Sequence, residues 1–220
     1  MAAATPSTWL RRLFRAREHT NASHYRVGGE VARYGLEAWW LGSFTDEERQ
    51  LISDTYRPLG LPHMSLTDGA ATYQPELSPF AFLANLATWL NRPPHGHLAR
   101  KVADFASTRP MPHDPWQTHF AYSNLCKVYY RWRDEDPDAL GKAIMACERD
   151  IEVSRSLNPE VEEGVVVAHH CYNQLRIILD KMGRFEEAIE LCDDAERGGW
   201  RGDWEHERQR LRRKIKKVGR

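Results

Sequence analysis

The pattern of apolar positions along the chain is helical over most of its length. From residue 79 to residue 200, apolar side chains recur every three or four positions, which places them along one face of an α-helix. The inward positions fall into four groups: Phe82, Leu83, Leu86, Trp89 and Leu90; Leu98, Val102 and Phe105; Tyr122, Leu125, Val128 and Tyr129; and Leu140, Ala143, Ile144, Cys147 and Ile151. We interpret Val165, Val166 and Val167 as the opening of a further helix. The pattern therefore predicts an all-α protein.

Capping signals indicate where helices begin. Thr45 followed by Glu48 is a capping box, in which the hydroxyl and the carboxylate satisfy free N–H groups at a helix start. Further along the chain, a good N-cap residue precedes a proline, whose fixed φ suits the first helical position. We expect a helix to begin at each of these four pairs: Ser78-Pro79, Asp114-Pro115, Asp136-Pro137 and Asn158-Pro159.

The first 77 residues carry a weaker pattern. Residues 9–17 are basic and amphipathic, which predicts a short docking helix. Residues 31–41 have a helical pattern with Gly35 in its middle. Residues 57–77 are rich in Pro, Gly, Ser and Thr, so we predict a loop with a short extended piece at 71–73.

Three pairs of helical segments repeat one pattern along the rest of the chain. Their first helices carry Leu86-x-x-Trp89-Leu90, Leu125-x-x-Val128-Tyr129 and Leu175-x-x-Ile178-Leu179, and their second helices carry Lys101-Val102-x-x-Phe105, Ala143-Ile144-x-x-Cys147 and Ala188-Ile189-x-x-Cys192. A helix pair with one apolar stripe cannot bury that stripe alone, so successive pairs are expected to stack. We predict an N-terminal helical and loop extension over 1–77 and a three-hairpin array with a capping helix over 78–220, together forming one compact unit.

The last hairpin resembles a tetratricopeptide repeat. The signature positions of that family hold Tyr172, Leu175, Leu179, Gly183, Phe185, Ala188, Ile189 and Ala195, while Arg176 and Cys192 depart from it. The resemblance covers residues 79–200 and is strongest at 172–195. It implies a right-handed α-solenoid with Gly183 at the tight turn and Ala188 where two helices approach closely.

The resemblance also implies a function. In such arrays the first helices line a concave groove that binds a peptide or a partner protein. The corresponding side chains are Asn85, Thr88, Asn124, Lys127, Asn173 and Gln174. Phe120 and His170, which lie five positions before the leucines of their hairpins, belong to the same predicted site. An amide precedes the leucine in each hairpin and offers both a donor and an acceptor to a peptide backbone. The alternative is that these polar residues only solvate an exposed helix face.

Charge leaves a second functional class open. The chain has 31 basic and 31 acidic residues, so its net charge does not favour nucleic acid or an anionic surface. Two segments are nevertheless basic: residues 11–17 and the tail that holds Arg208, Arg212, Arg213, Lys214, Lys216 and Lys217. They make nucleic-acid or anionic-surface binding an alternative function. The simpler interpretation of the tail is the polar outer face of a capping helix over 204–217.

Cysteine usage and hydropathy indicate a cytoplasmic protein. The four cysteines are widely separated and contain no CxxC pair, so we predict no disulfide framework and a reducing compartment. They are Cys126, Cys147, Cys171 and Cys192. No apolar run in the sequence is long enough to span a membrane.

His169-His170-Cys171, with Cys126 one hairpin earlier, is the most suggestive set of metal ligands. Adjacent residues on a helix point about 100° apart, however, so the three cannot all face one ion. We therefore expect them to pack in the core or groove, and we predict no metal and no cofactor. The sequence also lacks a glycine-rich phosphate loop, a G-x-S-x-G motif and an HExxH motif, so we expect no catalytic activity.

Overall fold

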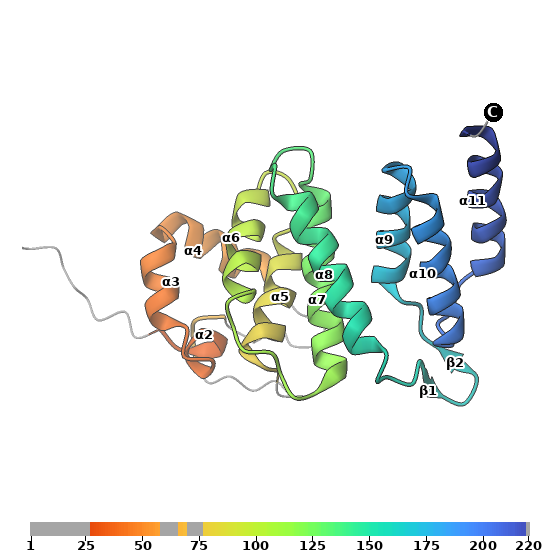
Figure 1. Cartoon of the computed structure of the whole chain (residues 1–220). Helices are drawn as coiled ribbons and strands as arrows, with labels where there is room; N and C mark the ends of the chain where they lie inside the picture. The colour runs from red at the N-terminus through yellow and green to blue at the C-terminus, as the bar shows by residue number, and fades with distance from the viewer. Residues whose placement is uncertain (1–26, 58–65, 70–76, 219–220) are drawn as a thin grey trace, which may run out of the picture.

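The computed structural model describes residues 27–57, 66–69 and 77–218, and it is mostly helical (Figure 1). The first three helices are short, and the later ones pack side by side. A two-stranded hairpin separates α8 from α9. The described helices are α2 (Gly29–Arg33), α3 (Glu37–Ser43), α4 (Asp46–Thr55), α5 (Pro79–Trp89), α6 (Gly96–Ala106), α7 (Pro115–Arg131), α8 (Ala139–Ser154), α9 (His170–Lys181), α10 (Phe185–Arg197) and α11 (Trp204–Val218).

Gly35 divides the helical pattern predicted over 31–41 into α2 and α3. Its φ of +64° lies in the left-handed region, which glycine adopts without the steric cost that a Cβ would bring. The capping box at the start of α4 is confirmed. The Glu48 N–H donates to Thr45 Oγ1 at 3.2 Å, and the Thr45 N–H donates to Glu48 Oε2 at 2.9 Å.

Aromatic contacts hold the N-terminal helices against the first hairpin. Trp39 of α3 stacks on Phe105 of α6, with ring centroids 4.4 Å apart. Tyr34 stacks on Phe82 of α5 at 4.6 Å. Because these neighbours surround α5, that helix is buried on most sides, from Phe80 to Ala87 with Asn85 half-buried.

The three predicted helix pairs are confirmed as α5 with α6, α7 with α8, and α9 with α10 (Figure 1). The pairs are joined because α5 packs on α7 and α8 packs on α9, and α11 covers α10. Two of the predicted cap–proline starts are also confirmed. Ser78 Oγ accepts from the Ala81 N–H at 3.1 Å, and Asp114 Oδ1 accepts from the Trp116 N–H at 2.9 Å.

The other two predicted helix starts are wrong. Asp136 lies in the turn before α8, where its carboxylate accepts from the Asp138 N–H at 3.0 Å, and the helix begins at Ala139. Asn158 accepts from the Glu160 N–H at 3.2 Å and leads into a strand. In both places the short polar side chain bonds to the backbone two residues on, which stabilises a turn instead of a helix.

The prediction that Val165–Val167 opens a helix is also wrong. Strand β2 (Val165–Val166) pairs antiparallel with β1 (Glu160–Glu162), and α9 begins only at His170. Gly164, with φ +75°, forms the turn between the strands. β-Branched valines favour an extended backbone, and this local preference outweighs the helical pattern that follows.

The glycine turn of the last hairpin is confirmed. Gly183 has φ +75° and donates to the Asp180 carbonyl at 3.2 Å, and the next N–H, from Arg184, donates to the Leu179 carbonyl at 2.9 Å. This pair of bonds is the Schellman ending of a helix. It reverses the chain tightly, so that Ala188 of α10 is fully buried.

The expected cap is present as α11. Trp200 and Trp204 are buried at its start, and the Trp204 indole N–H donates to the Trp200 carbonyl at 2.7 Å. Leu211 is buried and Ile215 half-buried on its inner face, while most of its basic residues face outward.

Some predictions concern residues outside the described ranges, namely the helix over 9–17 and the extended piece at 71–73. The described residues of the predicted loop over 57–77 form no helix or strand. Among the helices that the structure describes, none is long and apolar enough to cross a membrane.

Candidate functional site

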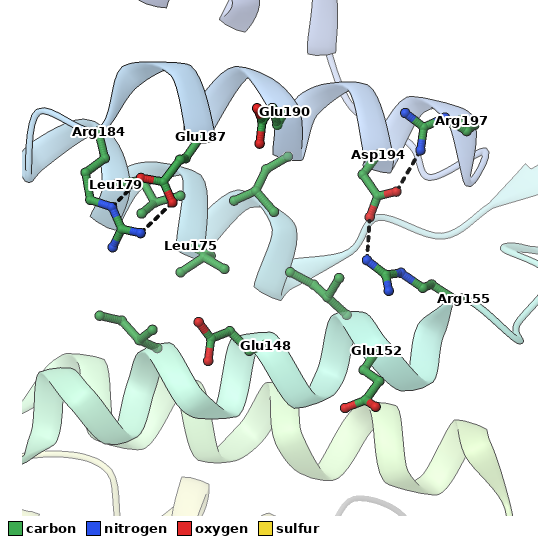
Figure 2. A pocket seen from close by; sticks show the side chains of 13 residues that line it. Glu148, Glu152, Arg155, Leu175, Leu179, Arg184, Glu187, Glu190, Asp194 and Arg197 are labelled. Carbon is green, nitrogen blue, oxygen red and sulfur yellow. Dashed lines mark hydrogen bonds and ion pairs between the residues drawn. The ribbon is translucent and has the colours of Figure 1, made fainter.

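A groove of about 620 Å³ runs between α8 and the α9–α10 hairpin (Figure 2). Helix α8 lines one wall with Ile144, Glu148, Ile151, Glu152 and Arg155. These residues are spaced by three, four or one positions, so they share one face of the helix. The apolar floor consists of Ile144, Ile151, Leu175, Leu179 and Leu191.

Charged side chains form the rim of the groove, and acids outnumber bases. The five acids are Glu148, Glu152, Glu187, Glu190 and Asp194, and the three bases are Arg155, Arg184 and Arg197. The arginines lie at the two ends of the groove (Figure 2). Because the acids outnumber the arginines, the middle of the groove is left negatively charged.

Ion pairs neutralise the ends of the groove. At one end, Arg184 Nε lies 2.6 Å from Glu187 Oε1, and this hydrogen bond holds the pKa of Glu187 below its ordinary value. At the other end, Asp194 contacts Arg197 at 3.0 Å and Arg155 at 3.5 Å.

Two acids between these ends have no such partner. Within the described part of the chain, neither Glu148 nor Glu190 forms an ion pair, and both are exposed. They approach the groove from opposite walls (Figure 2). The middle of the groove therefore combines an apolar floor with two exposed carboxylates, of which Glu148 also attracts Arg184 at a distance longer than an ion pair.

The opposite face of α8 is buried against α7 and α9, and it carries a polar cluster. His119 of α7 lies with Nδ1 2.7 Å from Asp150 Oδ1, and His169 Nδ1 lies 3.9 Å from Asp150 Oδ2. All three side chains are between 0 and 3% exposed. Burial raises the pKa of Asp150 above its ordinary value, while the hydrogen bond from His119 opposes that shift. We call this set the histidine–aspartate cluster.

His169 has a structural role in that cluster, because it is the N-cap of α9. Its Nδ1 accepts from the Tyr172 N–H at 3.3 Å, so in the neutral ring the proton resides on Nε2. Burial, together with smaller contributions from His119 and His170, lowers the pKa of His169 to about 3. The side chain is therefore neutral at physiological pH.

A second buried cluster lies next to the first. Cys126 of α7, Cys147 of α8 and Cys171 of α9 have sulfur atoms that all lie within 4.8 Å of one another. The Cys126 and Cys147 sulfurs are 3.2 Å apart, and all four cysteines of the chain are free, as the sequence predicts. We call Cys126, Cys147 and Cys171 the thiol cluster.

The three thiols differ in acidity. Hydrogen bonds from Cys147 and Cys171 lower the pKa of Cys126 well below its ordinary value. The bond to Cys126 raises the pKa of Cys147, and burial raises that of Cys171. The three thiols are therefore coupled to one another through their hydrogen bonds in a fully buried position.

Helix geometry explains how the two clusters form. His119 and Cys126 are seven residues apart on α7, and Cys147 and Asp150 are three apart on α8, so each pair shares one helix face. Because α7 and α8 pack side by side, the residues meet in two layers. Cys171 then reaches one layer, and His169, the N-cap of α9, reaches the other.

The sequence argument against a single ion bound by His169, His170 and Cys171 agrees with this geometry, because His169 and Cys171 belong to different clusters. Cys147, Asp150 and His119 are neighbours of these residues that the sequence pattern does not identify. Their spacing on predicted inward faces was the available signal. That spacing does not give the register of α8 and α9 along α7, which decides which inward residues meet.

The eight predicted partner-binding residues lie on α5, α7 and α9, and none of the eight lines the groove of Figure 2. Phe120 is 53% exposed and stacks against Trp116, and Lys127 is also exposed. The remaining six are half-buried: Asn85, Thr88, Asn124, His170, Asn173 and Gln174. Their role in binding stays a prediction.

The predicted basic patch is partly neutralised by acids of α9, α10 and α11. Arg208 is buried and contacts Asp193, Glu196 and Glu205 at 2.8 to 3.0 Å. Lys214 contacts Asp180 at 2.6 Å. The other four members of the patch are exposed: Arg212, Arg213, Lys216 and Lys217. Two of its six charges are therefore engaged in holding α11 on the preceding hairpin.

Comparison with known proteins does not supply a relative. No family model, no curated protein and no solved structure matches this chain.

Proposed function

We propose that the chain is a non-enzymatic interaction module whose α8–α10 groove binds a basic amphipathic helix of a partner protein. The observation that carries this proposal is the pairing of an apolar floor with two carboxylates, Glu148 and Glu190, that have no ion pair within the described residues. A partner helix with leucine-like residues on one side and lysine or arginine beside them complements both features.

The two features contribute differently to binding. Each leucine-sized side chain buried on the floor contributes about 1.5 to 3 kcal/mol before the costs of association. An exposed ion pair contributes at most about 1 kcal/mol. Because Leu175 and Leu179 are only 6% exposed, most of the apolar area buried on binding belongs to the partner helix. Those partner side chains supply affinity, and the acidic rim selects basic partners over acidic ones.

In this proposal the hairpins form a short tetratricopeptide-like array. The glycine ending of α9 and the fully buried Ala188 support that interpretation. The binding groove differs from the one that the resemblance implies, because Gln174 Nε2 is buried and the His170 ring is directed at Cys126. These contacts leave the first-helix face less available than the α8–α10 groove.

A labelled twelve-residue peptide provides the test, with leucines three and four positions apart on one helix face and lysines beside them. We expect saturable binding to the full chain by fluorescence anisotropy. The double variant Glu148→Gln/Glu190→Gln should bind the peptide about five- to tenfold more weakly, because it loses two favourable contacts of up to about 1 kcal/mol each.

A matched control is Glu162→Gln/Glu163→Gln, which removes two exposed acids from the β1–β2 hairpin outside the groove. This variant should bind the peptide as the unmodified chain does. Equal weakening in both double variants would show that net charge alone attracts the peptide. Equal binding of a leucine–glutamate peptide would also refute the proposal.

A further inference from the structure

The thiol cluster has the composition of a metal site. Three buried cysteine sulfurs converge from three different helices, α7, α8 and α9, within 4.8 Å of one another. In tetrahedral zinc coordination with Zn–S bonds of about 2.3 Å, neighbouring sulfurs lie about 3.8 Å apart. The separations here, 3.2 Å for Cys126 to Cys147 and no more than 4.8 Å for the other pairs, bracket that value.

A fourth ligand is available beside the three thiols. The His170 ring interacts with the Cys126 thiol, and its Nε2 atom is buried without a hydrogen-bond partner in the described structure. A buried imidazole nitrogen without a partner is costly, and a metal ion would satisfy it. His170 is the residue before Cys171 in the first turn of α9, so the two side chains leave the helix about 100° apart, and the His170 ring has to turn toward the three sulfurs to complete the set.

We propose that Cys126, Cys147, Cys171 and His170 bind a structural zinc ion that ties α7, α8 and α9 together. Three thiolates and one imidazole form a closed tetrahedral set, which is the coordination of structural rather than catalytic zinc. Binding releases the thiol protons to solvent, and no electron transfer is involved.

The neighbouring histidine–aspartate cluster is a poorer metal site. His169 Nε2 and Asp150 Oδ2 are also buried without a hydrogen-bond partner in the described structure, but His169 Nδ1 already accepts the Tyr172 N–H, and Asp150 Oδ1 is bonded to His119 at 2.7 Å. Its role is to position the zinc ligands. Asp150 lies beside the Cys171 thiol, and His169 fixes the first turn of α9, from which His170 and Cys171 project.

A disulfide is the main competing outcome for these cysteines. Cys126 and Cys147 are close enough to be joined after a small movement, but that bond would leave Cys171 as a third buried thiol and His170 Nε2 still without a partner. A zinc ion accounts for all four groups together. The geometry therefore favours the metal.

The test uses the full chain, purified under reducing conditions with zinc present. We expect one zinc per chain by elemental analysis, and X-ray absorption should show three sulfurs at about 2.3 Å and one nitrogen at about 2.0 Å. Replacing zinc with Co²⁺ should give a sulfur-to-cobalt charge-transfer band and the intense visible bands of a tetrahedral ion.

Variants separate the ligands from other buried cysteines. Cys126→Ser, Cys147→Ser and Cys171→Ser should each lose most of the charge-transfer band. His170→Ala should keep it but bind zinc at least about tenfold more weakly, as loss of a metal-site group does. Cys192→Ser is the matched control, because Cys192 is equally buried but its thiol donates to the Ala188 carbonyl on α10.

Measurements on the unmodified chain decide the question even if a cysteine variant fails to fold. A helical, reduced chain that holds no zinc and gives no cobalt band would overturn the proposal. A native Cys126–Cys147 disulfide found by mass spectrometry would overturn it too, and copper or iron at the same sulfurs would overturn the zinc assignment.

Discussion

Helices α8 and α9 present two faces that differ in burial and in chemistry. Their outer face, with α10, is an open groove with an apolar floor and charged residues held by exposed ion pairs (Figure 2). Their inner face, against α7, holds three thiols, two histidines and one aspartate, all almost inaccessible to solvent. The same kinds of groups, carboxylates among them, therefore have different energetic roles on the two sides.

The difference lies in what each polar group loses on folding. A carboxylate on the rim keeps its water and gains little from an ion pair. A buried carboxylate loses its water, and its hydrogen bonds must compensate for that loss. The inner face should therefore control stability, and the outer face should control recognition without affecting stability.

The largest expected difference is between Asp150 and Glu152, two acids on opposite faces of α8. Asp150→Ala removes the acceptor of His119 and leaves a buried imidazole without a partner, so we expect the free energy of unfolding to fall by about 3 kcal/mol. Glu152→Ala removes only an exposed contact with Arg149 at 3.0 Å and should cost about 0.5 kcal/mol or less. Urea denaturation followed by circular dichroism measures both.

A comparable loss in the two variants would show that the faces do not differ as argued. The measurement should be made in the presence of a chelator, so that loss of zinc from the Asp150→Ala chain does not add to the effect. Arg149→Ala provides a further control, since it removes the other partner of the same exposed contact.

A smaller effect is expected from pH, through His169. The folded chain keeps this ring neutral down to a pKa of about 3, whereas the unfolded chain takes up a proton near pH 6.5. The unfolded state therefore binds more protons between those values, and the free energy of unfolding falls as the pH decreases below 6.5. His169→Asn keeps an N-cap acceptor and should lack this loss, which amounts to about 1 kcal/mol per pH unit.

Asp150 acts in the opposite direction, because its raised pKa makes the folded state the better proton acceptor at low pH. That contribution is common to both chains, so their difference between pH 6.5 and 4.5 isolates His169. Parallel stability curves for the two chains would contradict the assigned burial of the histidine.

Much of the fold could be predicted from the sequence, because the residues that share one face of a helix are only three or four positions apart. The three helix pairs, the Thr45 capping box and the Gly183 turn all depend on residues within a few positions of each other. Leu175 and Leu179, which line the groove, also belong to the predicted repeat pattern of the last hairpin. Such features require no knowledge of the tertiary arrangement.

The clusters could not be predicted in the same way, because they depend on the register between helices. The β1–β2 hairpin, interpreted from the sequence as helix, determines where α9 begins and so which of its residues faces Cys126. The helix starts predicted at Asp136 and Asn158 are wrong for a related reason, because the same short polar side chain forms either an Asx turn or a helix N-cap. The segments that connect the helices, rather than the helices themselves, therefore kept the two clusters from being predicted.

The smallest expected effect concerns ionic strength, and it separates the two faces without altering the fold. Between about 0.1 M and 1 M salt the Debye length falls from about 10 Å to about 3 Å, which screens exposed charges but not buried ones. The leucine–lysine peptide should therefore bind the groove about three- to tenfold more weakly at the higher concentration, a change of about 0.6 to 1.4 kcal/mol. Glu148→Gln/Glu190→Gln should show a flatter salt response, because its remaining affinity comes from the apolar floor.

The cobalt band of the thiol cluster should not change with salt at all. A salt response of equal size in the variant would mean that Glu148 and Glu190 are not the groups that attract the peptide. A cobalt band that weakens with salt would mean that its ligands lie nearer the solvent than the buried inner face allows.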